Sequence, residues 1–157
     1  MHVRDVMTDD VVTVGPDASY AEIVDRLLAH DISGVPVTDD DGVLLGIVTE
    51  ADLVTREAYG PERRRPLGLI LDYLRDHDPT WVRKASASTA RRLMTHEVTT
   101  ASPDDELRVT AQRLLESGFR RLPVVGTDGR LVGIVSRRDV LAAVYGRPPD
   151  SGPSSRR

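Results

Sequence analysis

Cysteine is absent from this chain of 157 residues, which excludes disulfides, cysteine-based zinc sites and thiol catalysis. Asparagine is also absent, and Lys84 is the only lysine among 21 basic residues, a bias that we attribute to the coding sequence. No apolar stretch approaches the ~20 residues that span a bilayer. The first ten residues lack the apolar core of a signal peptide. We therefore expect a cytoplasmic protein with no membrane segment.

The composition is typical of a folded domain. Hydrophobic residues make up 39% of the chain and charged residues 29%, which are proportions of a soluble globular protein. The length is that of one ordinary domain and is sufficient to bury a core. The net charge of −4 weighs against nucleic acid as a partner.

An internal repeat organises the chain. When the sequence is displaced by 87 residues, residues 3–54 align with residues 90–141 without a gap, and 19 of the 52 pairs are identical. We call these segments the first repeat and the second repeat. Such self-similarity indicates duplicated structural units. The identical segments include Met7-Thr8 with Met94-Thr95, Pro36-Val37 with Pro123-Val124, and Gly46-Ile47-Val48 with Gly133-Ile134-Val135.

The first repeat predicts five elements. A β-branched run at residues 11–14 predicts a strand. Ser19 and Glu22 predict a capping box that begins an amphipathic helix. The pair Asp41-Gly42 between two apolar runs predicts a β-hairpin, and a second helix follows from about Glu50. The order is β-α-β-β-α.

The second repeat predicts the same order. Residues 98–100 correspond to the first strand, and Asp128-Gly129 corresponds to the hairpin turn. We expect Asp105 to cap the first helix and Gly118 to end it. Because one such unit is small for independent stability, the two should share a core. The sequence therefore predicts an α+β fold of tandem β-α-β-β-α repeats packed with pseudo-twofold symmetry.

The segment between the repeats has a helical pattern. Apolar residues at helical spacing follow Pro66, and Trp81 is the only tryptophan. This segment is either an arm that covers apolar surface of the core or of a second subunit, or a dedicated docking element. We expect a first unit at residues 1–60, a helical linker at 61–89, a second unit at 90–146 and a disordered tail at 147–157, with 1–146 forming one module.

Several motifs occur in both repeats. Each repeat ends in the pattern Gly-x-x-Thr/Ser-x-x-Asp, at residues 46–52 and 133–139. Further paired segments are Val6-Met7-Thr8, Leu93-Met94-Thr95, Val35-Pro36-Val37 and Leu122-Pro123-Val124-Val125. Over about residues 3–54 and 90–141, the chain resembles a pair of CBS domains, also called a Bateman module.

The resemblance implies a regulatory fold without catalysis of its own. Members of this family bind adenosine-containing ligands (AMP, ADP, ATP, sometimes S-adenosylmethionine) in two clefts between the repeats, and pairs commonly dimerise. No cofactor is required. We expect no regulated partner domain on this chain, so it resembles the stand-alone members.

The resemblance also implies four ribose-binding residues, which are Ser136 and Asp139 at one site and Thr49 and Asp52 at the other. Asp52 and Asp139 stand three residues after Thr49 and Ser136, which are placed to cap the second helix of each repeat. A carboxylate at that position can accept two hydrogen bonds from a ribose diol. Alternatively, each aspartate only stabilises its helix N-terminus.

Phosphate and adenine contacts follow from the same resemblance. The phosphate candidates are Arg120, Arg121, Arg137 and Arg138, which could instead be solvated or paired at an interface. The adenine pocket of the Asp139 site would use Val12, Ile32, Ser33 and Val35, and that of the Asp52 site would use Thr99, Phe119 and Leu122. The Asp52 site lacks phosphate arginines of its own and carries Glu50, which would repel a phosphate. We therefore expect a strong site at Asp139 and a weak or empty one at Asp52.

Other chemistries find no support in the sequence. The four histidines, His2, His30, His77 and His96, lack metal-ligand spacing, and we expect them on the surface and no metal site. The run Asp39-Asp40-Asp41-Gly42 lacks the glutamate that ends a calcium loop and predicts a turn. No nucleophile–base pair or nucleotide-binding glycine loop is recognisable. Arg63-Arg64-Arg65 is too short to indicate nucleic acid. We expect no enzymatic activity.

The charge is divided unequally between the repeats. The first repeat carries two arginines and twelve acidic residues, and the second carries nine arginines and seven acidic residues. This polarity favours a head-to-tail homodimer and directs anionic ligands to the second repeat. The leading hypothesis is an energy-sensing module that binds an adenine nucleotide and signals to a partner protein. The alternative is a ligand-free module that only dimerises or docks.

Overall fold

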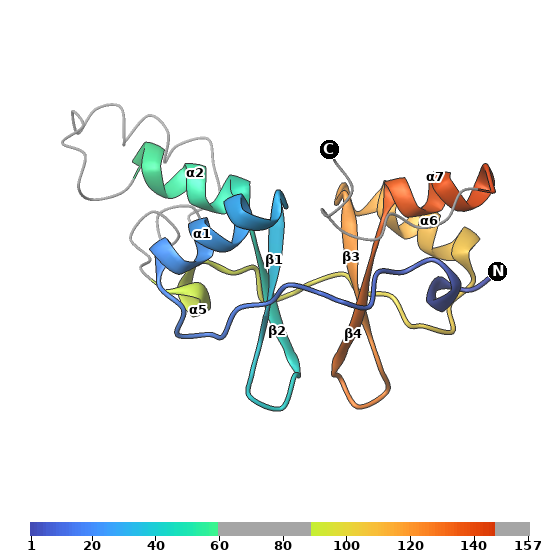
Figure 1. Cartoon of the computed structure of the whole chain (residues 1–157), viewed down its shortest axis with the longest axis horizontal. Coiled ribbons are helices and arrows are strands. Elements are labelled where there is room, and N and C mark those ends of the chain that lie inside the picture. The colour runs from blue at the N-terminus through green and yellow to red at the C-terminus, as the bar shows by residue number, and fades with distance from the viewer. Residues whose placement is uncertain (60–88, 147–157) are drawn as a thin grey trace.

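The structure, a computed structural model, describes residues 1–59 and 89–146. Two similar units stand side by side, each with an antiparallel hairpin near the middle of the molecule and helices toward the outside (Figure 1). This confirms the predicted α+β fold of two repeats. The first unit contains α1 (Tyr20–His30), β1 (Gly34–Thr38), β2 (Leu44–Thr49) and α2 (Glu50–Tyr59), and the second contains α6 (Leu107–Glu116), β3 (Arg121–Val125), β4 (Leu131–Ser136) and α7 (Arg137–Val144).

The expectations for the linker and the tail fall outside the described residues. These are the helix after Pro66, the role of Trp81, the cluster Arg63-Arg64-Arg65 and the disorder of residues 147–157. Among the residues that the structure does describe, no helix is long and apolar enough to cross a membrane.

Helix α1 begins with the predicted capping box. The Ser19 hydroxyl accepts a hydrogen bond from the Glu22 main-chain N–H at 3.2 Å, and the Glu22 carboxylate accepts one from the Ser19 N–H at 2.6 Å. The second bond lowers the pKa of Glu22, because it stabilises the ionised carboxylate. The helix ends at His30 and is followed by its C-cap, Asp31, which adopts a left-handed conformation with φ of 50°.

Helix α6 begins differently from the prediction. Its N-cap residue is Glu106 and not Asp105. The Asp105 carboxylate instead accepts a hydrogen bond from the Ser102 N–H at 3.0 Å and forms a 2.5 Å ion pair with Arg113. The predicted stop is confirmed, since Gly118 follows the helix with φ of 73°, a conformation that favours glycine.

Both predicted hairpins are present and share one register. Gly34 pairs with Thr49 at the open end of the β1–β2 hairpin, and Arg121 pairs with Ser136 at the equivalent place in β3–β4. The two turns meet at their tips, where the Leu44 N–H donates to the Gly129 carbonyl at 3.1 Å. The hairpins are thereby joined side by side along the middle of the molecule (Figure 1).

The predicted first strand of each repeat is reduced to a single bridge. Val14 pairs in parallel with Val37, and Ala101 pairs in parallel with Val124. Residues 11–13 and 98–100 form no ladder. The next main-chain donor of this parallel pairing would be Pro36 toward residue 12 and Pro123 toward residue 99. A proline cannot donate a ladder hydrogen bond, which limits each pairing to one residue.

Each repeat begins on the body of the other. The 3-10 helix η1 (Val3–Asp5) lies beside α6 and α7, whereas the short helix α5 (Ala90–Leu93) lies below α1 (Figure 1). Thr8 then pairs with Ile134 of β4, and Thr95 pairs with Ile47 of β2. The two N-terminal segments are therefore exchanged between the repeats.

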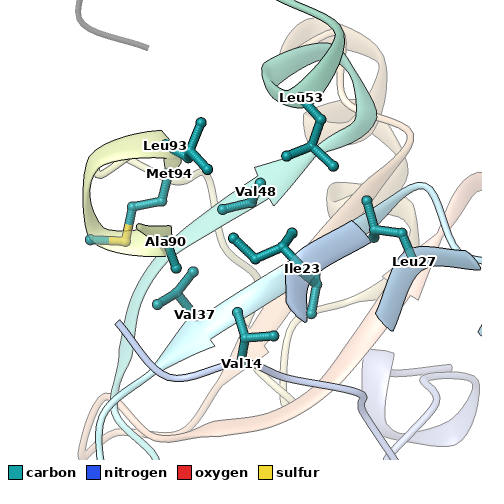
Figure 2. Close-up of a cluster of buried hydrophobic side chains, with 10 residues drawn as sticks. Val14, Ile23, Leu27, Val37, Val48, Leu53, Ala90, Leu93 and Met94 are labelled. Atoms are coloured by element: carbon teal, nitrogen blue, oxygen red, sulfur yellow. The ribbon is translucent and has the colours of Figure 1, made fainter. Parts of the chain in front are cut away.

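Two hydrophobic cores result from this exchange. Ala90, Leu93 and Met94 of the second repeat reach into the core of the first, where they meet β1, β2 and α1 (Figure 2). Val3 and Val6 enter the core of the second repeat in the same manner. Neither repeat completes its core alone, and this explains why the two units pack against each other.

Candidate functional site

A cleft of about 240 Å³ lies between the two repeats, and we call it the Asp139 cleft. Both repeats contribute to its wall. The first repeat supplies Thr8, Asp10, Val11, Val12, His30, Ile32, Gly34 and Pro36, and the second supplies Arg121, Ile134, Ser136, Arg138 and Asp139. The first repeat thus contributes both apolar side chains and the polar side chains of Thr8, Asp10 and His30, whereas the second contributes mainly polar side chains around the start of α7.

The start of α7 fixes Asp139 in this wall. Its carboxylate Oδ2 accepts hydrogen bonds from the Ser136 N–H and the Ser136 hydroxyl, both at 2.7 Å. The Asp139 N–H in turn donates to the Ser136 hydroxyl at 3.2 Å. Asp139 is only 6% exposed. The predicted helix cap is confirmed, and it occupies one oxygen of the carboxylate.

A second cleft of about 420 Å³ opens at the start of α2, and we call it the Thr49 cleft. Its wall consists of Ser33, Gly34, Ile47, Thr49, Glu50, Ala51, Gly118, Phe119, Arg120 and Arg121. Asp52 is 5% exposed and is not among these lining residues. Its Oδ2 accepts from the Thr49 N–H at 2.8 Å and from the Thr49 hydroxyl at 3.2 Å. The two aspartates therefore make the same cap, but only Asp139 lines its cleft.

Arg121 lines both clefts. It is half-buried, and its Nε is enclosed by protein without a hydrogen-bond partner. Burial lowers the pKa of the Arg121 guanidinium, while the nearby carboxylates of Asp139 and Glu50 act in the opposite direction. An arginine in this setting remains charged, and it offers N–H donors to an anion placed between the repeats.

The other arginines predicted to bind phosphate do not all line the same cleft. Arg138 lines the Asp139 cleft, whereas Arg120 lines the Thr49 cleft. Our prediction placed Arg120 with Asp139 and left the other site without arginines, so the structure distributes the basic residues more evenly. The Arg137 guanidinium donates to the Leu114 carbonyl of α6 at 3.1 Å, which directs it to a structural contact between helices.

Most of the residues predicted to contact adenine are likewise divided between the two clefts and the two cores. Val12 and Ile32 line the Asp139 cleft, and Phe119 lines the Thr49 cleft, each at the predicted site. Ser33 lines the Thr49 cleft rather than the Asp139 cleft. Val35 and Leu122 are fully buried in the two cores and line neither cleft. Thr99 is half-buried and lines neither cleft.

The sequence did not predict several residues of the Asp139 cleft. His30, which we expected on the surface, is the last residue of α1 and lines this cleft together with Asp10. Thr8 reaches it through the exchange of N-terminal segments. The repeated Met-Thr motif could have pointed to Thr8, but no pattern pointed to His30.

Metal chemistry has no visible centre in this part of the molecule. Within residues 1–59 and 89–146, no group of three or more histidine, aspartate or glutamate side chains could hold a metal ion. His2 and His96 are exposed, and His77 lies outside the described residues. The polar groups of the clefts are instead suited to hydroxyl and anionic groups of an organic ligand.

Comparison with protein families decides the relationship. A model described as "CBS domain" matches the chain twice, at residues 3–59 and 90–146. The chain belongs to the CBS-domain family. Both matches coincide with the units described above, so the molecule is a pair of CBS domains whose clefts lie between the repeats.

Among curated relatives, the CBS domain-containing protein CBSX2 of Arabidopsis thaliana, a chloroplastic protein, is 31% identical over 152 residues. The match covers 90% of this chain and 62% of CBSX2, so the chain spans less than two thirds of that relative. The uncharacterised protein MJ1426 of Methanocaldococcus jannaschii is 30% identical over 159 residues, which cover 92% of this chain and 91% of MJ1426.

Solved structures show the same architecture. CBSX2 crystallised in complex with AMP superposes with a TM-score of 0.73 and 30% identity, over 92% of this chain and 96% of that one. The CBS domain pair of protein MJ0100, in complex with 5′-methylthioadenosine and S-adenosyl-L-methionine, gives a TM-score of 0.71 at 24% identity, over 93% of this chain and 97% of that one. At this identity, the similarity to the MJ0100 domain pair shows a shared fold alone.

Proposed function

We propose that this CBS-domain pair is a regulatory, non-catalytic module that binds an adenine nucleotide in the Asp139 cleft. The observation that carries the proposal is the hydrogen-bonded Ser136–Asp139 pair, in which Asp139 is buried, and which lines a cleft together with Arg121, Arg138 and the apolar side chain of Ile32. The complex of the relative CBSX2 with AMP supports the ligand class.

The cleft provides a partner for each part of such a ligand. Asp139 Oδ2 is engaged in the helix cap, and Oδ1 of the same carboxylate would accept hydrogen bonds from the ribose hydroxyls. Arg121 and Arg138 would pair with the phosphate. Val12 and Ile32 would pack against the adenine ring.

We rank the Thr49 cleft as the weaker site. Thr49, Arg120 and the exposed carboxylate of Glu50 line it, and the exposed carboxylate of Asp10 lines the Asp139 cleft in the same way, so the ranking depends on the two aspartates at the helix caps. The carboxylate of Asp52 is absent from its wall. A nucleotide there would lack the acceptor that Asp139 supplies in the other cleft.

Signalling to a partner would follow from the position of the ligand between the repeats. A nucleotide that contacts both walls favours the arrangement of repeats in which both contacts are made, and it changes the surface offered to a partner protein by population shift. Energy sensing requires that AMP, ADP and ATP differ in affinity. We place this function in the cytoplasm, which fractionation of cells with an antibody to the chain would test.

The helices also carry an apolar surface that suits a second copy of the chain. Leu28 of α1 and Leu115 of α6 are equivalent in the two repeats, and they are 76% and 70% exposed. Val54 and Leu141 form another equivalent exposed pair. Leu28 and Val54 line the same pocket, and large exposed apolar side chains are typical of interfaces. The acidic first repeat and the more basic second repeat would favour a head-to-tail homodimer.

Isothermal titration with AMP, ADP, ATP and S-adenosylmethionine tests the ligand. We expect saturable binding of at least one of them at micromolar to millimolar concentration. Absence of binding by all four at millimolar concentration would reject the nucleotide function and leave the exposed apolar surface as support for a ligand-free dimerisation module.

A further inference from the structure

The walls of the two clefts have two residues in common. Of the residues that line them, Gly34 and Arg121 are common to both. Gly34 begins β1 and Arg121 begins β3, at equivalent positions of the two repeats. At this position the first repeat has a glycine and the second has an arginine. The walls shared by the two clefts therefore contain one guanidinium, where two identical repeats would supply two.

The surroundings of Arg121 hold its guanidinium between the clefts. Arg121 pairs in register with Ser136, next to Asp139 of one cleft. The carboxylate of Glu50, in the other cleft, is close enough to act on the same guanidinium. Its Nε has no hydrogen-bond partner in the described structure. The Arg121 side chain therefore has the Asp139 carboxylate on one side and the Glu50 carboxylate on the other, and its Nε is hydrogen-bonded to neither.

Each of the other arginines in the walls belongs to one cleft alone. Arg138 lines only the Asp139 cleft, and Arg120 lines only the Thr49 cleft. Gly34 has no side chain, and a Cβ added there would lie 3.3 Å from the Val48 carbonyl oxygen. An anion in either cleft would draw on Arg121, and a second anion in the other cleft would then find it engaged.

We infer that Arg121 is a shared anion-binding residue that couples the two clefts negatively, so that a phosphate-bearing ligand in the Asp139 cleft weakens binding of a second one in the Thr49 cleft. The inference rests on the proposed nucleotide binding. It adds that the coupling depends on phosphate, because the neutral nucleoside adenosine does not require a guanidinium.

The test uses methyl NMR of the full chain, because each cleft has its own isoleucine reporter. Ile32 and Ile134 report on the Asp139 cleft, and Ile47 reports on the Thr49 cleft. Val11→Trp would fill the Asp139 cleft, since Val11 lines it and belongs to neither core cluster. AMP is then titrated into the wild type, Val11→Trp, and Val11→Trp combined with Arg121→Met.

In the wild type, we expect the Ile47 signal to report a dissociation constant about fivefold or more weaker than in Val11→Trp, where the Asp139 cleft is filled without an anion. Adding Arg121→Met should abolish that gain. Arg92→Met, an exposed arginine of α5 outside both clefts, should retain it. With adenosine, the wild type and Val11→Trp should give the same constant at Ile47.

The possible outcomes distinguish failure of the proposed nucleotide binding from failure of the proposed coupling through Arg121. If no isoleucine responds to AMP, the nucleotide function itself fails. If all three respond, but Ile47 reports equal constants in the wild type and in Val11→Trp, the clefts bind independently and the shared role of Arg121 is overturned. Ala51→Trp, which fills the Thr49 cleft from an exposed position of α2, isolates the Asp139 cleft and confirms the assignment of signals.

Discussion

Gly46 lies directly against the main chain of Thr95. A Cβ placed on Gly46 would lie 2.6 Å from the Thr95 carbonyl oxygen, and the Thr95 N–H donates to the neighbouring Ile47 carbonyl at 2.9 Å. Gly133 stands in the same relationship to Met7 and Thr8. The glycine of each terminal motif therefore allows the other repeat's N-terminal segment to dock.

Gly46→Ala should destabilise the protein. The added methyl group cannot fit without moving the Thr95 segment, and overpacking of this kind costs about 1–3 kcal/mol of unfolding free energy. Urea denaturation followed by circular dichroism measures it. Gly15→Ala is the matched control, because no atom lies within 4 Å of a Cβ at that position. Equal stability of the two variants would contradict the docking account.

Thr110→Val should stabilise the protein. Thr110 is fully buried in α6, and its hydroxyl has no hydrogen-bond partner. Valine has nearly the same shape, so the substitution removes an unsatisfied polar group, and we expect a gain of about 1 kcal/mol in urea denaturation. Thr55→Val is the control, because the Thr55 hydroxyl donates to the Ala51 carbonyl at 2.7 Å and should show no gain. A loss of stability in Thr110→Val would refute this reasoning.

Asp139→Asn should weaken AMP binding more than Asp52→Asn. Both residues occupy the same cap position, so the two substitutions should cost comparable helix stability, but only Asp139 lines its cleft. Loss of a charged acceptor for ribose corresponds to an increase of about tenfold in the dissociation constant, measured calorimetrically. The reverse order of the two variants would refute the ranking of the sites.

Leu28→Glu combined with Leu115→Glu should abolish the proposed dimer. Both leucines are exposed on the helices, and a carboxylate buried in an apolar interface is unfavourable. Sedimentation velocity should show a dimer for the wild type and a monomer for the double variant. Thr127→Glu, in the exposed turn of the second hairpin, should remain dimeric. A monomeric wild type would reject both the dimer and its head-to-tail arrangement.

Local features of the fold could be predicted from the sequence because their partners lie within a few residues. The Ser19–Glu22 and Ser136–Asp139 caps join residues three positions apart, and the Asp-Gly hairpin turns depend on their own backbone conformation. The duplication extended each prediction to the second repeat. The prediction that Asp105 caps the first helix of the second repeat was wrong, because the Asp105 carboxylate forms an ion pair with Arg113, eight positions away.

The clefts could be predicted only in part because they depend on contacts between distant segments. The exchange of η1 and α5 leaves no local pattern, and it brings Thr8 to the cleft wall. His30 reaches the same wall because α1 ends there. The inward burial of Val35 and Leu122 depends on which face of each hairpin meets its helices, which an apolar strand does not reveal.

A crystal structure of the chain with AMP tests the central claim most directly. We predict AMP in the Asp139 cleft, with its ribose hydroxyls on the Asp139 carboxylate, its phosphate at Arg121 and its adenine beside Ile32. AMP bound away from both clefts, or empty clefts in crystals grown at saturating AMP, would contradict the account.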